Sequence, residues 1–291
     1  MKIVLAQHFG LCFGVRDAIA HARQLARTGS LTILGELVHN PIVREQLRAE
    51  GVDEASLDDA GVQTRRVMIT AHGASDLQRN KWRTAGFEVE DATCPLVRHA
   101  HEQLKQLVAA RYFPIVIGKP GHVEVRGLTE DFPCAVVIEF DSDIAKLPPH
   151  PRYGVISQTT QPIQRVHELV ESIKAHYPNS EVLFVDTVCK PTKDRQSSLR
   201  ALIAQADTIV VVGGRHSNNT RQLVQTCRTA GRRTFHIERA EELAPADFRD
   251  ARVVGLTAGT STLPETVTAV WRRLEEISSA QDNHPSQPSK P

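Results

Sequence analysis

The sequence of 291 residues lacks the features that mark several common protein classes. Lys and Arg together number 35 against 34 Asp and Glu, so no excess of positive charge favours nucleic acid or an anionic membrane as a partner. No apolar run approaches the roughly 18–20 residues of a membrane-spanning helix. Neither a Walker motif nor the glycine fingerprint of dinucleotide-binding folds is present, so no nucleotide is indicated. Any anion binding must therefore be local, at particular loops.

The first residues do not read as a targeting signal. Gln7 and His8 interrupt the apolar stretch, no small-residue cleavage site follows, and Arg16 and Asp17 begin an amphipathic pattern. We therefore expect a strand and a loop at the start of a cytoplasmic protein. In that compartment, five cysteines favour metal or redox chemistry over disulfides.

Short apolar segments alternate with helical patterns along most of the chain, which is typical of a parallel α/β fold. The helical pattern predicts helices over residues 15–27, 41–50, 95–110, 161–175, 192–206 and 263–277. Strands are predicted within residues 2–7, 31–35, 66–73, 87–94, 114–118, 135–140, 153–160, 181–189, 208–214, 234–238 and 253–261. Residues 278–291 are polar and rich in Pro and Ser, which predicts a disordered tail.

Three types of strand ending recur along the chain. The first type is Gly followed four residues later by His or Ser, at residues 35–39, 118–122 and 213–217. The second is Thr or Ser with a polar turn, at residues 70–73, 157–160 and 257–261. The third is Asp-x-x-Cys, at residues 91–94 and 186–189, and the loop with Cys12 supplies the missing third copy. Such self-similarity indicates a repeated unit.

The repeats predict three similar small parallel-sheet α/β units, over residues 13–94, 95–189 and 190–277 together with 1–12. Ligands of open α/β sheets bind beyond the carboxyl ends of the strands, where each repeated motif lies. Three units around a pseudo-threefold axis would therefore direct three cysteines and six polar loops to one central cavity.

Cys12, Cys94 and Cys189 are the cysteines at these strand ends. Three converging thiolates suit an iron–sulfur cluster or zinc, but structural zinc sites usually contain closely paired cysteines, which these three are not. A cluster held by three cysteines leaves one iron open to act as a Lewis acid toward substrate oxygen. Buried, unreactive thiols are the alternative, and we expect that role for Cys134 and Cys227.

Polar side chains occupy the other strand-end loops, which we expect to precede helices. Helix N-termini attract anions, and imidazole, hydroxyl and amide donors there could bind a phosphate or diphosphate. The alternative is that these side chains are ordinary helix caps, a role that Asn40, Ser217 and Ser261 would suit. The candidate anion-binding residues are His39, His72, His122, Ser217, Asn219 and Ser261.

Glu124 follows His122 by two residues. A carboxylate in the first turn of a helix often only complements the helix dipole. Inside a dry cavity beside a cluster, however, desolvation would raise the pKa of Glu124 and make it a proton donor. Thr159 could relay that proton or orient a substrate hydroxyl.

Together, these motifs resemble those of the 4-hydroxy-3-methylbut-2-enyl diphosphate reductases, iron–sulfur enzymes of the non-mevalonate isoprenoid pathway. The resemblance extends from residue 1 to about residue 275, with every motif present and in order. Departures from the commonest family pattern flank Cys12 and Cys189, in residues 7–11 and 190–192, where they could tune a cluster. The matching motifs span residues 10–15, 38–41, 71–73, 91–97, 121–125, 157–160, 188–196, 217–220 and 257–261.

The resemblance implies a trefoil of three domains around a [4Fe–4S] cluster on Cys12, Cys94 and Cys189, which oxidative loss could convert to [3Fe–4S]. It implies that Glu124 is the proton donor and that Thr159 lies near the allylic hydroxyl. The products would be isopentenyl and dimethylallyl diphosphate, with electrons from a ferredoxin or flavodoxin type donor. The implied diphosphate contacts are His39, His72, His122, Ser217, Asn218, Asn219 and Ser261.

Two other functions fit a cluster-bearing chain. A hydro-lyase would use the open iron only as a Lewis acid and would need no electron donor. A sensor or phosphate-binding module would carry out no catalysis. The presence of Glu124 and Thr159 argues against the sensor, because sensing needs no acid at that position.

Overall fold

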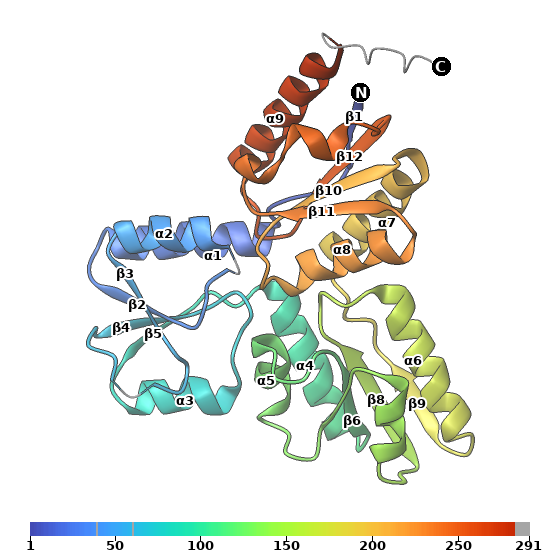
Figure 1. Cartoon of the computed structure of the whole chain (residues 1–291). Coiled ribbons are helices and arrows are strands. Elements are labelled where there is room, and N and C mark those ends of the chain that lie inside the picture. The colour runs from blue at the N-terminus through green and yellow to red at the C-terminus, as the bar shows by residue number, and fades with distance from the viewer. Residues whose placement is uncertain (39, 60, 283–291) are drawn as a thin grey trace. The chain divides into compact units, whose positions relative to one another are not determined.

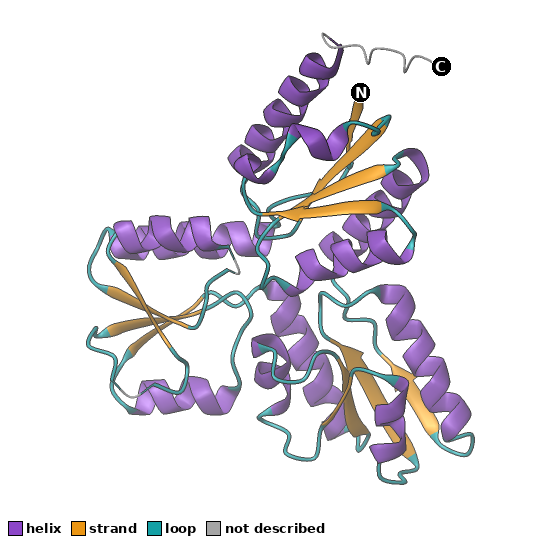
Figure 2. Ribbon diagram, viewed as in Figure 1, coloured by secondary structure: helices purple, strands orange, loops and turns teal. Residues whose placement is uncertain are grey.

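The computed structural model describes residues 1–38, 40–59 and 61–282. These residues form three four-stranded sheets in which every strand pairing is parallel (Figures 1 and 2). The prediction of an α/β fold with three similar parallel-sheet units is confirmed. By compactness the chain divides into two parts. We call Met1–Cys12 with Asp194–Pro291 the split unit, and Phe13–Lys193 the central unit.

The split unit contains one sheet, with the strand order β1-β12-β10-β11. Its inner strand β10 is buried at all five positions and apolar at the last four, as expected for a parallel strand with helices on both faces. Helix α9 continues past the end predicted at residue 277, and the rest of the predicted tail, 283–291, lies outside the described residues. The elements are β1 (Lys2–Leu5), α7 (Lys190–Gln205, which begins in the central unit), β10 (Thr208–Val212), α8 (Asn218–Thr229), β11 (Arg233–Ile237), β12 (Val253–Ala258) and α9 (Pro264–Asp282).

The first sheet of the central unit has the order β3-β2-β4-β5. Helices α1 and α2 cover one face and α3 covers the other (Figure 1). Buried Leu34, Val67, Ile69 and Trp82 form part of its core. The elements are α1 (Phe13–Ala26), β2 (Leu31–Leu34), α2 (Pro41–Ala49), β3 (Val52–Ala55), β4 (Arg66–Ile69), α3 (Asp76–Thr84) and β5 (Glu88–Asp91).

The second sheet of the central unit has the order β7-β6-β8-β9. All three sheets share one strand order when β1 is counted after β12, which is the structural counterpart of the sequence repeats. The elements are α4 (Pro95–Ala109), β6 (Phe113–Ile117), α5 (Val123–Thr129), β7 (Val136–Ile138), β8 (Arg152–Ser157), α6 (Ile163–His176) and β9 (Glu181–Phe184). Within the described residues, no helix is long and apolar enough to cross a membrane.

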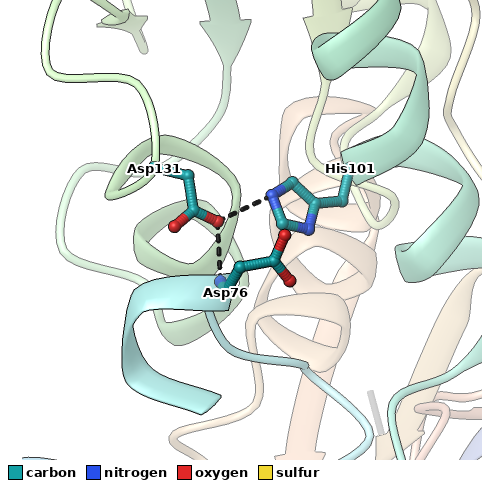
Figure 3. Close-up of side chains that lie close together, drawn as sticks. All are labelled: Asp76, His101 and Asp131. Atoms are coloured by element: carbon teal, nitrogen blue, oxygen red, sulfur yellow. Dashed lines mark hydrogen bonds and ion pairs between the residues drawn. The ribbon is translucent and has the colours of Figure 1, made fainter. Parts of the chain in front are cut away.

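The two sheets of the central unit are joined at the N-terminus of α3, a contact that we call the seam. The carboxylate of Asp131 accepts hydrogen bonds from the backbone N–H of Asp76 at 2.7 Å and of Leu77 at 3.0 Å. The ring Nε2 of His101, on α4, lies 3.0 Å from the same carboxylate (Figure 3). Asp131 therefore satisfies helix donors that would otherwise lack partners.

Ligand atoms of Asp76, His101 and Asp131 lie within 4.8 Å of one another, a spacing that a metal ion could bridge. Two cationic side chains already approach this cluster. Lys105 Nζ lies 2.5 Å from one carboxylate oxygen of Asp76, and Arg79 Nη1 lies 3.4 Å from the other. We therefore interpret the cluster as a structural clamp between α3 and α4.

Candidate active site

All three predicted ligand cysteines are held by the same backbone contact. The N–H of Cys94 donates to the carbonyl of Ala71 at 3.0 Å, and that of Cys189 donates to Thr159 at 3.0 Å. In the split unit, the N–H of Cys12 donates to Thr260 at 3.1 Å. In each case the cysteine follows one strand and the acceptor follows its neighbour in the sheet. The repeated topology therefore places each thiol at the carboxyl edge of its own sheet.

The Asp-x-x-Cys motifs also fold alike. Asp91 accepts a hydrogen bond from the N–H of Thr93 at 3.0 Å, and Asp186 accepts one from Val188 at 3.1 Å. Such turns, in which an Asp side chain binds the backbone two residues later, fix the loop without secondary structure. Burial alone would raise the pKa of Asp91, but hydrogen bonds from Thr93 and the nearby Arg79 lower it below its usual value. Asp91 is thus ionised at neutral pH.

The surroundings of the thiols favour ligand chemistry over inert packing. Cys12, Cys94 and Cys189 are partly accessible, and the Cys189 thiol donates to Thr192 Oγ1 at 3.1 Å. Cys227, in contrast, is fully buried in an apolar cluster, and burial raises the pKa of its thiol to about 12. The prediction that Cys134 is buried is wrong, because this residue lies exposed on the loop before β7.

Gly14, in the first turn of α1, lies directly against the Cys94 thiol. A Cβ added at this position would lie 2.5 Å from Cys94 Sγ, closer than such atoms can pack. Only glycine fits here without displacing the sulfur. Gly14 belongs to the motif at residues 10–15, but nothing else in the sequence distinguishes it from the other glycines.

Glu124 is a buried carboxyl with an unusual proton affinity. The residue is only 1% exposed. One carboxylate oxygen accepts a hydrogen bond from the N–H of Thr159 at 2.6 Å, and the other accepts one from the Thr159 hydroxyl at 3.1 Å. Burial raises the pKa of Glu124 to about 7, although the two bonds from Thr159 act in the opposite direction. A carboxyl with this pKa can hold and release a proton at neutral pH.

Two of the predicted histidines lie next to this carboxyl. His122 caps α5, with its Nδ1 accepting a hydrogen bond from the N–H of Glu124 at 3.1 Å. The His72 ring packs edge-on against His122, with ring centroids 5.7 Å apart. His72 and Glu124 also line a cavity of about 10 Å³, the size of one water molecule. The central unit therefore brings His72, His122, Glu124 and Thr159 into one cluster.

In the split unit, one predicted residue contacts the loop that holds Cys12. The side chain of Asn219 accepts a hydrogen bond from the N–H of Thr260 at 3.0 Å, and the carbonyl of Thr260 accepts the one from Cys12. Ser217 caps α8 by accepting from the N–H of Thr220 at 3.3 Å. The remaining predicted residues of this unit, Asn218 and Ser261, are buried.

His39 lies outside the described residues, and its neighbour Asn40 is the cap of α2. Sequence reasoning missed one further residue beside the cysteines. Arg79 on α3 contacts both Asp91 and Thr93. It sits in a strongly polar segment whose pattern predicted no helix.

The chain is similar to proteins of one known family. The LytB protein family model matches residues 3–275. A relative from Aquifex aeolicus and another from Geotalea uraniireducens are each 34% identical, over 97% and 95% of this chain and 98% of each relative. Both are named 4-hydroxy-3-methylbut-2-enyl diphosphate reductase.

Two solved structures are also similar. The E-1-hydroxy-2-methyl-but-2-enyl-4-diphosphate reductase of Plasmodium falciparum matches with a TM-score of 0.86 and 25% identity, covering 98% of this chain and 89% of that one. A structure of (E)-4-hydroxy-3-methyl-but-2-enyl diphosphate reductase matches with a TM-score of 0.69 and 34% identity, covering 95% and 100%. As its motifs predicted, this chain belongs to the LytB family of 4-hydroxy-3-methylbut-2-enyl diphosphate reductases.

Proposed function

We propose that this chain reduces 4-hydroxy-3-methylbut-2-enyl diphosphate to isopentenyl and dimethylallyl diphosphate, with a [4Fe–4S] cluster on Cys12, Cys94 and Cys189. One relationship supports this proposal most strongly. Thr159 contacts Glu124 through its N–H and hydroxyl, and its carbonyl accepts the N–H of Cys189. A single residue thus links a carboxyl of pKa about 7 to a cysteine loop that occurs three times in the fold.

The donor set fits a cluster with one open iron. The three thiols have identical backbone support, and all are partly accessible. When bound, the cluster would supply the electrons for the reaction and a Lewis-acidic iron without a protein ligand.

Glu124 would supply a proton to the departing hydroxyl, with the Thr159 hydroxyl as its hydrogen-bonding partner. Two electrons and two protons convert the allylic alcohol into an alkene and water. Because Glu124 is buried, bulk water does not compete for its proton. Its burial is therefore part of its catalytic role.

The diphosphate would bind to imidazole, hydroxyl and amide donors at the strand ends. His72 and His122 lie beside Glu124 in the central unit. The residues proposed to complete the diphosphate site are His39, Ser217, Asn218, Asn219 and Ser261. A ferredoxin or flavodoxin type protein would deliver the electrons, and the chain would act in the cytoplasm.

The test is anaerobic purification and reconstitution, followed by an assay with reduced viologen and the allylic diphosphate. The proposal expects both alkene diphosphates to form and viologen to be oxidised in step. Dehydration of the substrate without viologen oxidation would instead identify a hydro-lyase. Iron incorporation with neither reaction would identify a sensor or binding module.

A further inference from the structure

Arg79 is a buried cation that the proposed chemistry does not use. The residue is 8% exposed and lies on α3, one helical turn after Asp76 of the seam. Its guanidinium donates to the carbonyl of Ala74 and to Thr93 Oγ1 at 3.1 Å, and its Nε lies 3.1 Å from Asp91 Oδ2. A guanidinium held by this many partners is fixed in one orientation.

Apart from Asp76 on the same helix, the partners of Arg79 belong to two different loops. Ala74 closes the loop that carries His72, whereas Asp91 and Thr93 shape the loop that carries Cys94. We infer that Arg79 is a positioning residue that sets the Cys94 thiol relative to the His72 imidazole. This inference rests on the proposed function, since it concerns a proposed cluster ligand and a proposed diphosphate ligand.

Only arginine suits this position. Its planar fork offers five N–H donors in fixed directions, so it can bind a carbonyl, a carboxylate and a hydroxyl at once. A lysine ammonium offers its donors from a single atom and cannot reach all three acceptors. The ionised carboxylate of Asp91 provides the pairing that a buried cation requires.

The second Asp-x-x-Cys loop shows what a weaker support looks like. There, Asp186 pairs with Lys193, and their side chains are 38% and 34% exposed, respectively. The side chains of Asp91 and Arg79 are only 21% and 10% exposed. Solvent screens the first pair far more than the second. The Cys94 loop should therefore depend on Arg79 more than the Cys189 loop depends on Lys193.

The experiment compares Arg79→Met and Arg79→Lys with Arg66→Met. Arg66 is a matched control because it is an arginine at the start of β4, whereas the loop with His72 follows the end of that strand. There it contacts Thr28 and Glu88. Three properties are measured on the anaerobically reconstituted chain: iron retained against a chelator, the electron paramagnetic resonance spectrum, and kcat and KM. The alkylation rate of Cys94 in the cluster-free chain, mapped by mass spectrometry, is a readout that needs no metal.

Both Arg79 variants should lose iron about 10–100-fold faster, as expected when a group that orients a metal ligand is removed. Their spectrum should change, their KM should rise and their Cys94 alkylation rate should shift, while Arg66→Met stays within about twofold of the parent chain. Iron retention, spectrum and alkylation rate equal to those of Arg66→Met would overturn the inference. If Arg79→Met does not fold, Arg79→Lys and Thr93→Val decide by the same measurements.

The two proposals fail in distinguishable ways. A parent chain that binds the cluster but does not turn over the diphosphate would contradict the proposed function. Iron retention and the alkylation rate of Cys94 would still decide the role of Arg79.

Discussion

The carboxylate of Glu124 accepts two hydrogen bonds from Thr159, one from the backbone N–H at 2.6 Å and one from the hydroxyl at 3.1 Å. These bonds favour the ionised form of Glu124, and burial opposes them more strongly. The balance leaves the pKa of Glu124 at about 7, which suits a group that must donate a proton and regain it in every cycle.

Replacing Glu124 by Gln should nearly abolish turnover, because the amide cannot donate a proton as an acid. General acids typically contribute about 10²–10⁴-fold to a rate, so kcat should fall by at least about 100-fold. Iron content and cluster absorbance should remain unchanged. Glu102→Gln, on the surface of α4, is the control and should keep the parent kcat. Normal activity in Glu124→Gln would exclude Glu124 as the donor.

The rate should fall as the pH rises, because the reaction needs a protonated acid. Protonated Glu124 is the active form, and its pKa lies at about 7. Above that pH, kcat/KM should fall about tenfold per pH unit, and below it the contribution of Glu124 should level off. A pH profile measured with a reduced mediator of pH-independent potential checks this. A rate that rises from pH 7 to 9 would contradict the assignment.

Loss of iron should separate the five cysteines into two groups. Cys12→Ser, Cys94→Ser and Cys189→Ser should lose most of the iron, whereas Cys134→Ser and Cys227→Ser should keep it. Cys227→Ser places a hydroxyl in an apolar cluster, so it should lower thermal stability without changing the iron per folded chain. Iron and sulfide analysis of each purified variant tests the grouping. Iron loss in either of the last two variants would revise the ligand list.

Adding a single methyl group at Gly14 should disturb the cluster. The new Cβ of Gly14→Ala would lie 2.5 Å from Cys94 Sγ, so the sulfur or the helix must shift by about 1 Å. We expect about a tenfold loss of iron retention, although alanine favours a helix more than glycine does. Arg16→Ala, exposed on the same helix, is the control. Unchanged iron in Gly14→Ala would show that the thiol position is not critical.

Asp131→Asn should weaken the seam. The asparagine still offers one oxygen to the N-terminus of α3, but it loses the charge that faces the helix dipole and lies 3.0 Å from His101 Nε2. A loss of about 1–2 kcal/mol in unfolding free energy is expected, measured by urea titration against the exposed control Asp17→Asn. Equal urea midpoints for the two variants would show that the seam contributes little.

Most of the regular structure could be predicted from the sequence, because parallel strands buried on both faces are continuous apolar runs. The segment IVVV at residues 209–212 of β10 is an example, since all four positions are buried. No helix was predicted over α5 or α8. The pattern also missed β3, whose sequence VDEA is half charged, and helix α3, whose sequence DLQRNKWRT shows little apolar periodicity. Both elements are held by tertiary contacts rather than by an apolar pattern of their own.

For the candidate site, the sequence could predict only the residue types and their spacing along the chain. Repetition pointed to Cys94 and Cys189, because an Asp three residues before a Cys occurs at the ends of two corresponding strands. It could not reveal that Arg79 connects the loops of His72 and Cys94, since that contact joins residues from different elements through side-chain directions. The roles of the site residues stay predictions that the experiments above address.

The most direct test of the account is one coupled assay. The anaerobically reconstituted chain is mixed with reduced viologen and 4-hydroxy-3-methylbut-2-enyl diphosphate, and viologen oxidation is followed alongside product analysis. The account predicts that two electrons are consumed for each molecule of isopentenyl or dimethylallyl diphosphate formed. A chain that carries its full cluster and oxidises no viologen in the presence of this substrate would contradict it.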